Sequence, residues 1–152
     1  MAKEPMMMTL NKIVITRKFQ CGPKELFNWL VQPELVARWF GPKHFLIGTV
    51  HTDLRVGGHY SIELKSANHP FFIEGEYLEI EAPNKLVFSF QYRGLSSRPP
   101  DSIVRITIEE ETENESLLSL TQDFVSAPSD MEKRTESWEY MVSILSKHIA
   151  KR

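Results

Sequence analysis

The sequence has one cysteine and no long apolar run, and each lack excludes a class of protein. Because Cys21 is the only cysteine among 152 residues, no intrachain disulfide can form, as is usual in a reducing compartment. No stretch of about 18 apolar residues could cross a membrane, and the first residues lack the apolar segment of a secretory signal. We therefore expect a cytoplasmic protein with no membrane insertion.

An excess of charge of one sign is also lacking. The chain carries 18 Lys and Arg residues against 20 Asp and Glu residues, a formal net charge of −2, so no basic field could hold a nucleic-acid backbone. Neither a nucleophile elbow nor a glycine-rich phosphate loop occurs, and the histidines lack metal-site spacing. We predict no nucleic-acid partner, no metal, no cofactor and no motif-borne catalytic residue. The histidines are His44, His51, His59, His69 and His148.

The composition is that of an ordinary folded domain that is rich in rings. Hydrophobic residues make up 41% of the chain and aromatic residues 11%, far from the composition of disordered chains. A chain of this length can bury a core within one domain. Residues 1–10 are predicted to form a flexible leader, and residues 11–152 a single domain.

Hydrophobic periodicity predicts the order of the elements. Residues 12–20 alternate as in a strand, and Pro23 and Pro33 are each typical of the first turn of a short helix. Beyond residue 44 the period is mostly two, with turn signals too closely spaced for helical crossovers. A run of glutamates at 109–115 predicts a solvated hairpin tip. Six further strands are expected at 44–52, 58–66, 71–80, 85–92, 102–110 and 116–124.

The C-terminal segment predicts a long helix. Ser129 and Glu132 form an S-x-x-E capping-box pattern. A helix of about 20 residues would be roughly 30 Å long, enough to cross a sheet of seven strands. We predict an α+β helix-grip fold: a curved seven-stranded antiparallel sheet wrapped around this helix, with two short helices after the first strand. The apolar stripe of the helix is Trp138, Met141, Val142, Leu145 and Ile149.

Three features of the predicted sheet leave alternatives open. Arg17 falls on the apolar face of the first strand, so it must find a partner or reach an edge. Gln122 is in register with apolar positions of the last strand, which directs an amide inward toward a backbone group or a buried water. A bulge near Tyr77 and Glu79 would exchange the faces of these two residues.

Motifs along nearly the whole chain resemble those of one superfamily. They are Arg17 with Phe19, P-E-L-V-A-R-W-F-G-P at 33–42, D-L-R-V-G-G-H-Y at 53–60, G-E-Y-L-E-I at 75–80, and Trp138 with Leu145. In these motifs the chain resembles the START-like superfamily, also called SRPBCC or Bet v 1-like, and within it the activator of heat-shock-protein-90 ATPase homologues. It departs from them at Ser137, where glycine is expected, and at Gln122, where histidine is frequent. The resemblance implies a hydrophobic pocket between the sheet and the C-terminal helix.

The rings are more numerous than a compact core of this size requires. Each ring by itself is typical of a core, but a curved sheet held off a helix leaves space that rings can line. Among the inward residues, Gln122 or a tyrosine hydroxyl would orient a ligand. The predicted ligand-binding residues are Trp39, Phe45, Tyr60, Phe72, Tyr77, Phe88, Phe90, Gln122, Trp138 and Met141.

Three functions are compatible with this sequence. The first is binding of a small hydrophobic or aromatic molecule in the cavity. The second is an enzyme of the cyclase, aromatase or hydrolase kind, as in some START-like relatives, which would need a group of perturbed pKa in the cavity. The third is regulation of a chaperone ATPase, which rests on the family name alone. The oligomeric state stays open, with a homodimer as one option.

Overall fold

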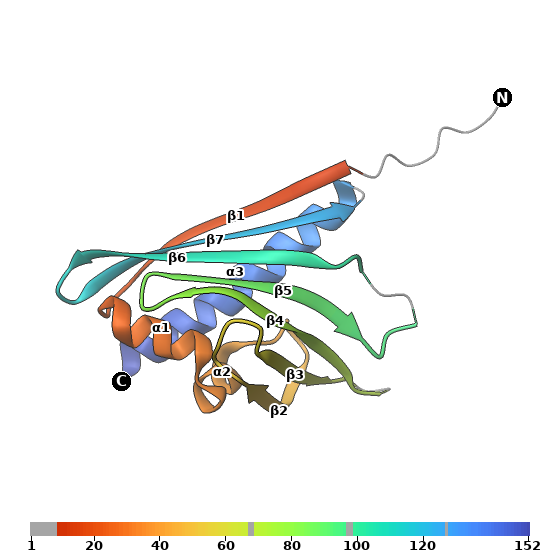
Figure 1. Cartoon of the computed structure of the whole chain (residues 1–152), viewed down its shortest axis with the longest axis horizontal. Coiled ribbons are helices and arrows are strands. Elements are labelled where there is room, and N and C mark those ends of the chain that lie inside the picture. The colour runs from red at the N-terminus through yellow and green to blue at the C-terminus, as the bar shows by residue number, and fades with distance from the viewer. Residues whose placement is uncertain (1–8, 67–68, 97–98, 127) are drawn as a thin grey trace.

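The computed structural model describes residues 9–66, 69–96, 99–126 and 128–152, and it shows the predicted helix-grip architecture (Figure 1). One strand is followed by two short helices, six strands and a long helix, as predicted. The elements are β1 (Thr9–Phe19), α1 (Pro23–Val31), α2 (Pro33–Trp39), β2 (Leu46–Thr52), β3 (His59–Lys65), β4 (Phe71–Glu81), β5 (Lys85–Arg93), β6 (Ser102–Thr112), β7 (Glu115–Ser126) and α3 (Pro128–Lys151).

The first strand and the long helix each begin slightly earlier than predicted. β1 starts at Thr9, so the last two residues of the predicted leader belong to the sheet, and residues 1–8 lie outside the described residues. The helix α3 starts at Pro128, one residue before Ser129. Proline is suited to a first helical turn because its missing N–H would have no partner there.

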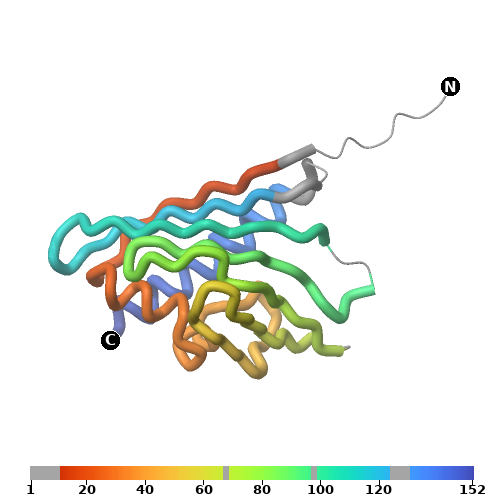
Figure 2. The backbone as a smooth tube through the Cα atoms, viewed as in Figure 1, coloured from red at the N-terminus to blue at the C-terminus, as the bar shows by residue number. Residues whose placement is uncertain are grey.

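All seven strands form one antiparallel sheet in the order β1-β7-β6-β5-β4-β3-β2. The backbone trace in Figure 2 shows the first strand lying beside the last. β1 and β2 are neighbours in sequence among the strands, yet they form opposite edges of the sheet. The connection that carries α1 and α2 must therefore cross from one edge to the other, while α3 lies behind the sheet (Figure 1).

The two short helices are separated at Gln32, as the sequence predicts. The backbone of Gln32 is extended, and it caps both helices. Its N–H donates to Asn28 of α1, and its carbonyl accepts from Leu35 and Val36 of α2. Since one residue ends α1 and begins α2, their relative direction is set over a very short length of chain.

A bulge in β4 resolves the ambiguity at Tyr77. The pairing of β4 with β5 shifts between Tyr77 and Glu79. Tyr77 is only 4% exposed, whereas Leu78 is 38% exposed and Glu79 is also exposed. The extra residue thus keeps Tyr77 on the inner face and turns the next two side chains outward, as expected for a bulge.

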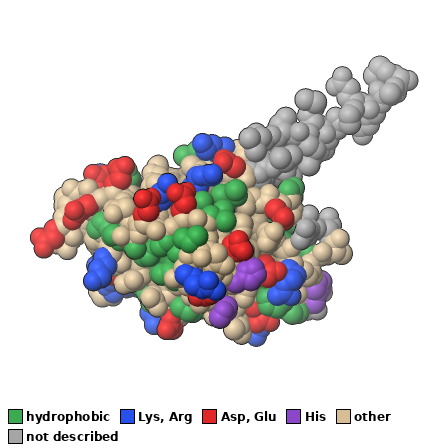
Figure 3. Space-filling view, in the orientation of Figure 1, with side chains coloured by type: hydrophobic (Ala, Val, Ile, Leu, Met, Phe, Trp, Pro, Cys, Tyr) green, Lys and Arg blue, Asp and Glu red, His purple; other side chains and the backbone are tan. Residues whose placement is uncertain are grey.

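The surface accounts for two other expectations. Arg17 is exposed, so its side chain reaches the sheet edge instead of being enclosed by the core. The side chains of residues 109–115 are exposed and form the acidic end of the β6–β7 hairpin, at the left of Figure 3. No helix in the described part of the chain is long and apolar enough to cross a membrane.

Gly75 allows β3, β4 and β5 to approach closely beneath the rings of the inner face. It pairs with Tyr60 of β3, and a Cβ atom at this position would collide with the backbone carbonyl of Ser89 in β5. The same carbonyl accepts the Tyr60 hydroxyl. Any side chain at position 75 would therefore force apart two strands that hold the inner face together.

We expect Gly75→Ala to lower the free energy of unfolding by at least about 2 kcal/mol, because the added methyl group meets backbone atoms that cannot turn away. Urea denaturation measures the change. Glu76→Ala, a change at the next and exposed position, serves as the control and should change stability by less than about 0.5 kcal/mol. Equal stability of Gly75→Ala and the parent protein would contradict this account.

Candidate functional site

A cavity lies between the inner face of the sheet, the two short helices and α3. Its volume is about 40 Å³, and about 480 Å³ of space free of protein atoms, open solvent included, lies over the same residues. The hollow thus combines a small interior with a wider opening. It is lined by Leu30, Val36, Trp39, Phe40, Thr52, Tyr60, Ile62, Tyr77, Leu86, Phe88, Phe90, Ile106 and Trp138.

Two groups of rings form most of the wall. On β3, β4 and β5, Tyr60 lies 5.4 Å from Phe88 and 5.7 Å from Tyr77, measured between ring centroids. The other group joins α2 and the end of β5 to α3, where Trp138 lies 6.0 Å from both Phe40 and Phe90. These separations are typical of edge-to-face and tilted ring contacts, which stabilise beyond the area that they bury.

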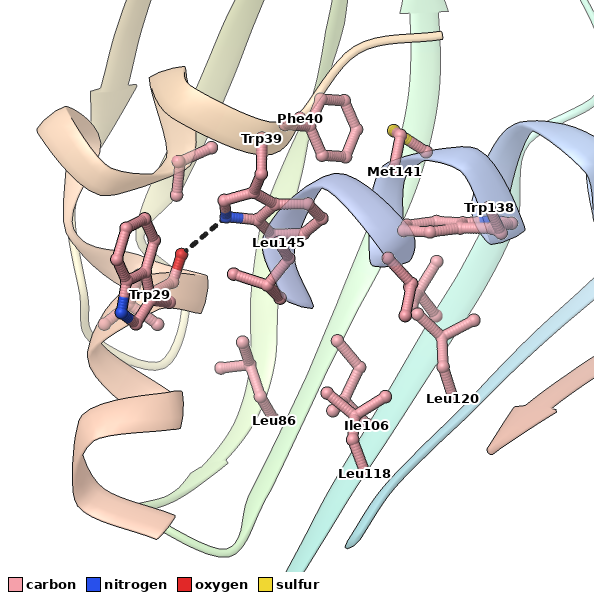
Figure 4. Packing of buried hydrophobic residues seen from close by; sticks show 14 of the residues in the cluster. Trp29, Trp39, Phe40, Leu86, Ile106, Leu118, Leu120, Trp138, Met141 and Leu145 are labelled. Atoms are coloured by element: carbon pink, nitrogen blue, oxygen red, sulfur yellow. Dashed lines mark hydrogen bonds between the residues drawn. The ribbon is translucent and has the colours of Figure 1, made fainter. Parts of the chain in front are cut away.

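Trp39 is held in place by a hydrogen bond between the short helices. Its indole Nε1 donates to the carbonyl of Trp29 over 2.8 Å. Figure 4 shows this bond, with Trp39 and Phe40 lying between α2 and α3. Trp29 in turn stacks on His148 of α3 at 5.9 Å. Both short helices are therefore tied to the long helix through aromatic side chains.

Trp138 is fixed by a buried polar chain that answers the question of Gln122. The indole Nε1 of Trp138 donates to Gln122 Oε1 over 2.7 Å, and Gln122 Nε2 donates to Ser102 Oγ over 2.8 Å. Ser102 Oγ lies 3.5 Å from the Phe90 carbonyl. Gln122 thus satisfies an indole and a hydroxyl, and it ties α3 to β7 and β6.

A second hollow of about 40 Å³ lies on the other side of Phe90 and Trp138, which line both spaces. Its polar part is on α3 and β5, where Arg134 Nη1 donates to the Tyr92 hydroxyl over 2.7 Å. The other lining residues are Pro42, Ile73, Ser137 and Met141. The Phe90–Trp138 pair is therefore a partition between an apolar space and a more polar one.

The structure brings six of the ten predicted ligand-binding residues to the cavity wall: Trp39, Tyr60, Tyr77, Phe88, Phe90 and Trp138. Met141 lines the second hollow, and its sulfur accepts the Gly41 N–H over 3.1 Å. Gln122 lies behind Trp138 and does not line the cavity. These two residues support the walls.

Phe45 and Phe72 lie elsewhere. Phe45 packs edge to face on Phe71 at 5.4 Å, away from the lining residues. Phe72 is on the opposite face of β4, where the Arg93 guanidinium lies 4.1 Å from the centre of its ring. Strand alternation carries this signal, because Phe71, Ile73 and Tyr77 face inward and Phe72 is out of step with them.

Seven lining residues were not among the predicted ligand-binding residues, although the periodicity placed several of them inward. Leu86 and Ile106 are in register with predicted apolar positions of β5 and β6. Phe40 and Thr52 follow or end short elements, where alternation carries little information. The seven are Leu30, Val36, Phe40, Thr52, Ile62, Leu86 and Ile106.

The hydroxyl groups in the wall hold their protons strongly. Burial raises the pKa of Tyr60 well above its ordinary value, and its hydroxyl donates to the Ser89 carbonyl over 2.6 Å. Burial, together with the negative charge of Asp53, raises the pKa of Tyr77 to about 12. None of the described lining residues carries a charge. Among the described residues, no group of His, Cys, Asp and Glu could hold a metal ion.

Comparison with known proteins places the chain in a family. The sequence profile described as "Activator of Hsp90 ATPase homolog 1-like protein" matches residues 20–150. The chain belongs to this family. No curated protein matches it. The earlier resemblance to this branch of the START-like superfamily is thereby confirmed.

Solved structures support the fold of this family member. Protein CV1439 from Chromobacterium violaceum superposes with a TM-score of 0.81 at 21% identity, over 91% of this chain and 97% of that one. The AHSA1 protein SPO3351 from Silicibacter pomeroyi gives 0.78 at 18% identity, over 92% and 98%. CalU16 from Micromonospora echinospora gives 0.68 at 22% identity, over 96% and 87%.

Replacing Gln122 by Met should lower the free energy of unfolding by about 2–3 kcal/mol, because it leaves the Trp138 indole N–H and its neighbour Ser102 without their partner. Trp138→Phe removes the donor itself. In a double-mutant cycle followed by urea denaturation, the double variant should lose less stability than the sum of the two single changes. Strict additivity would show that the bond does not couple α3 to β7.

Stability should fall at high pH because of the buried tyrosines of this AHSA1-family chain. A tyrosine whose pKa is higher in the folded state keeps its proton more tightly when folded, so its stabilising contribution is complete below the ordinary pKa of 10.0. For Tyr77 this contribution is lost as the pH rises from 10 toward 12. Urea unfolding from about pH 9 to about pH 11.5 should show a shallower fall for Tyr77→Phe. Tyr140→Phe, at an exposed position, should follow the parent protein.

Proposed function

We propose that this AHSA1-family protein binds a small apolar, aromatic ligand in the cavity between its sheet and its helices. The observation that carries the proposal is the lining: eight elements of the fold converge on one hollow with rings and aliphatic side chains and without a charge. Ligand sites are typically concave and apolar, with a few polar groups for orientation.

The ligand must displace part of the wall. A volume of about 40 Å³ holds roughly three waters, since one water needs about 10–15 Å³. Ligand sites typically measure about 300–1,000 Å³. Trp39 and Phe40 are the rings best placed to move, because they lie at the end of the seven-residue helix α2. Gly41 follows them with φ of 138°, a conformation that leaves the chain free to turn there.

The expected affinity is modest. A bicyclic aromatic molecule that buries about 300 Å² of apolar surface gains about 7.5 kcal/mol at about 25 cal/mol per Å². This corresponds to a dissociation constant of a few micromolar before the cost of moving the rings is subtracted. Ligand binding should therefore be measured at micromolar to millimolar concentrations.

The enzyme alternative has less support. A cyclase, aromatase or hydrolase needs a proton acceptor or a nucleophile beside the substrate. The described lining offers hydroxyl groups, and the tyrosine pKa values are raised, which favours retention of the proton. Regulation of a chaperone ATPase is suggested by the family description and by no contact in the cavity.

Filling the cavity should abolish binding. In Leu86→Phe the larger side chain occupies the space, so it should remove binding of the neutral probe N-phenyl-1-naphthylamine with a stability change below about 1.5 kcal/mol. Probe fluorescence in a titration measures binding, and thermal unfolding measures stability.

Leu118→Phe is the matched control, because Leu118 is equally buried but does not line the cavity (Figure 4). This variant should lose more stability, since no space receives the ring, and it should still bind the probe. The proposal fails if the parent protein does not bind, or if Leu86→Phe binds as tightly as the parent.

A further inference from the structure

Tyr77 carries the one hydroxyl of the cavity rings that no protein atom uses among the described residues. Its side chain is 4% exposed, and it lines the cavity. The Tyr60 hydroxyl donates to the Ser89 carbonyl, and the Tyr92 hydroxyl in the second hollow accepts from Arg134. The Tyr77 hydroxyl makes no hydrogen bond to a described residue. Since buried polar groups are nearly always hydrogen-bonded, this hydroxyl faces space that a ligand atom or a water can occupy.

The ring of Tyr77 is held firmly, so the position of its hydroxyl is set before a ligand arrives. Its backbone N–H donates to the Gly58 carbonyl over 3.0 Å, and its carbonyl accepts from Gly57 over 2.8 Å. Its ring contacts Tyr60 at 5.7 Å and Phe88 at 6.5 Å between centroids. A donor that is already in place binds an acceptor at a lower entropic cost than a mobile one.

The surroundings of Tyr77 define the charge of a suitable ligand. Thr52, the only lining residue besides the tyrosines with a polar side chain, precedes Asp53, whose negative charge acts on the Tyr77 phenol. A carboxylate or phosphate bound here would be repelled by Asp53 and would lose its hydration in a wall without cations. The phenol stays protonated across the neutral range, because its pKa is about 12. It therefore acts as a neutral donor.

We infer that Tyr77 donates a hydrogen bond to an oxygen acceptor on the ligand, and that the ligand is an uncharged aromatic carbonyl compound, such as a ketone or an ester. The inference rests on the proposed function and makes it more specific. A pure hydrocarbon would leave the Tyr77 hydroxyl without a partner once water is expelled, and leaving a buried polar group unpaired is costly. An anion would meet the opposite charge balance from the one it needs.

The test compares two probes that differ only in the acceptor. 2-Acetylnaphthalene carries a carbonyl oxygen, and 2-ethylnaphthalene has nearly the same shape without it. Quenching of the tryptophan fluorescence reports binding, because Trp39 and Trp138 line the cavity. The parent protein should bind the ketone about tenfold more tightly than the hydrocarbon, the ratio expected for one buried hydrogen bond.

The variants separate Tyr77 from its neighbour. In Tyr77→Phe the ketone should lose about tenfold in affinity, and the hydrocarbon should bind as before or slightly better. Tyr60→Phe is the matched control, because the Tyr60 hydroxyl is already bonded to Ser89. It should lower stability and leave the ratio between the two probes unchanged.

A second measurement covers the case in which a variant does not fold. The infrared band of a carbonyl shifts to lower frequency when the oxygen accepts a hydrogen bond, so the ketone bound to the parent protein should show this shift. A band at the frequency seen in a hydrocarbon solvent would overturn the inference. So would equal binding of the two probes by the parent protein, while the proposed function would stand. If neither probe binds at all, the proposed function fails as well.

Discussion

The hydrogen bond between Trp138 and Gln122 is the constraint on which the cavity depends. Apolar burial attracts α3 to the sheet but is not directional, so it does not by itself fix how the helix is rotated. The indole N–H must meet the Gln122 carbonyl oxygen inside the core, because an unpaired buried donor is costly. This bond turns Trp138 toward the sheet, where its ring forms a wall of both hollows.

The rings that stabilise this protein are also the rings that line its cavity. They fill the space almost completely, so a ligand can enter only if part of the wall moves. The sheet rings are supported by neighbouring strands on both sides, while Trp39 and Phe40 stand on a short helix. Binding and stability are therefore linked: the same contacts that are lost when α2 shifts must be replaced by contacts to the ligand.

Much of the fold follows from local patterns, and the candidate site follows from them only in part. Alternation along the strands predicted the seven-stranded sheet, and helical spacing predicted the buried stripe of α3, including Trp138 and Leu145. Phe72 shows the limit of choosing by residue type, because ring chemistry suggested a ligand contact while strand parity placed the ring outside. Phe45 lies in a loop, where no period indicates the direction of a side chain.

The sequence by itself determined the order of the elements, their amphipathic faces and the family, because these depend on short-range periodicity and on motifs that are contiguous in the chain. Only the tertiary structure decided that Gln122 serves an indole, that a bulge keeps Tyr77 inward, and that thirteen side chains from eight elements enclose one hollow. These contacts join residues far apart in sequence, and their geometry depends on how the sheet twists and where α3 rests on it.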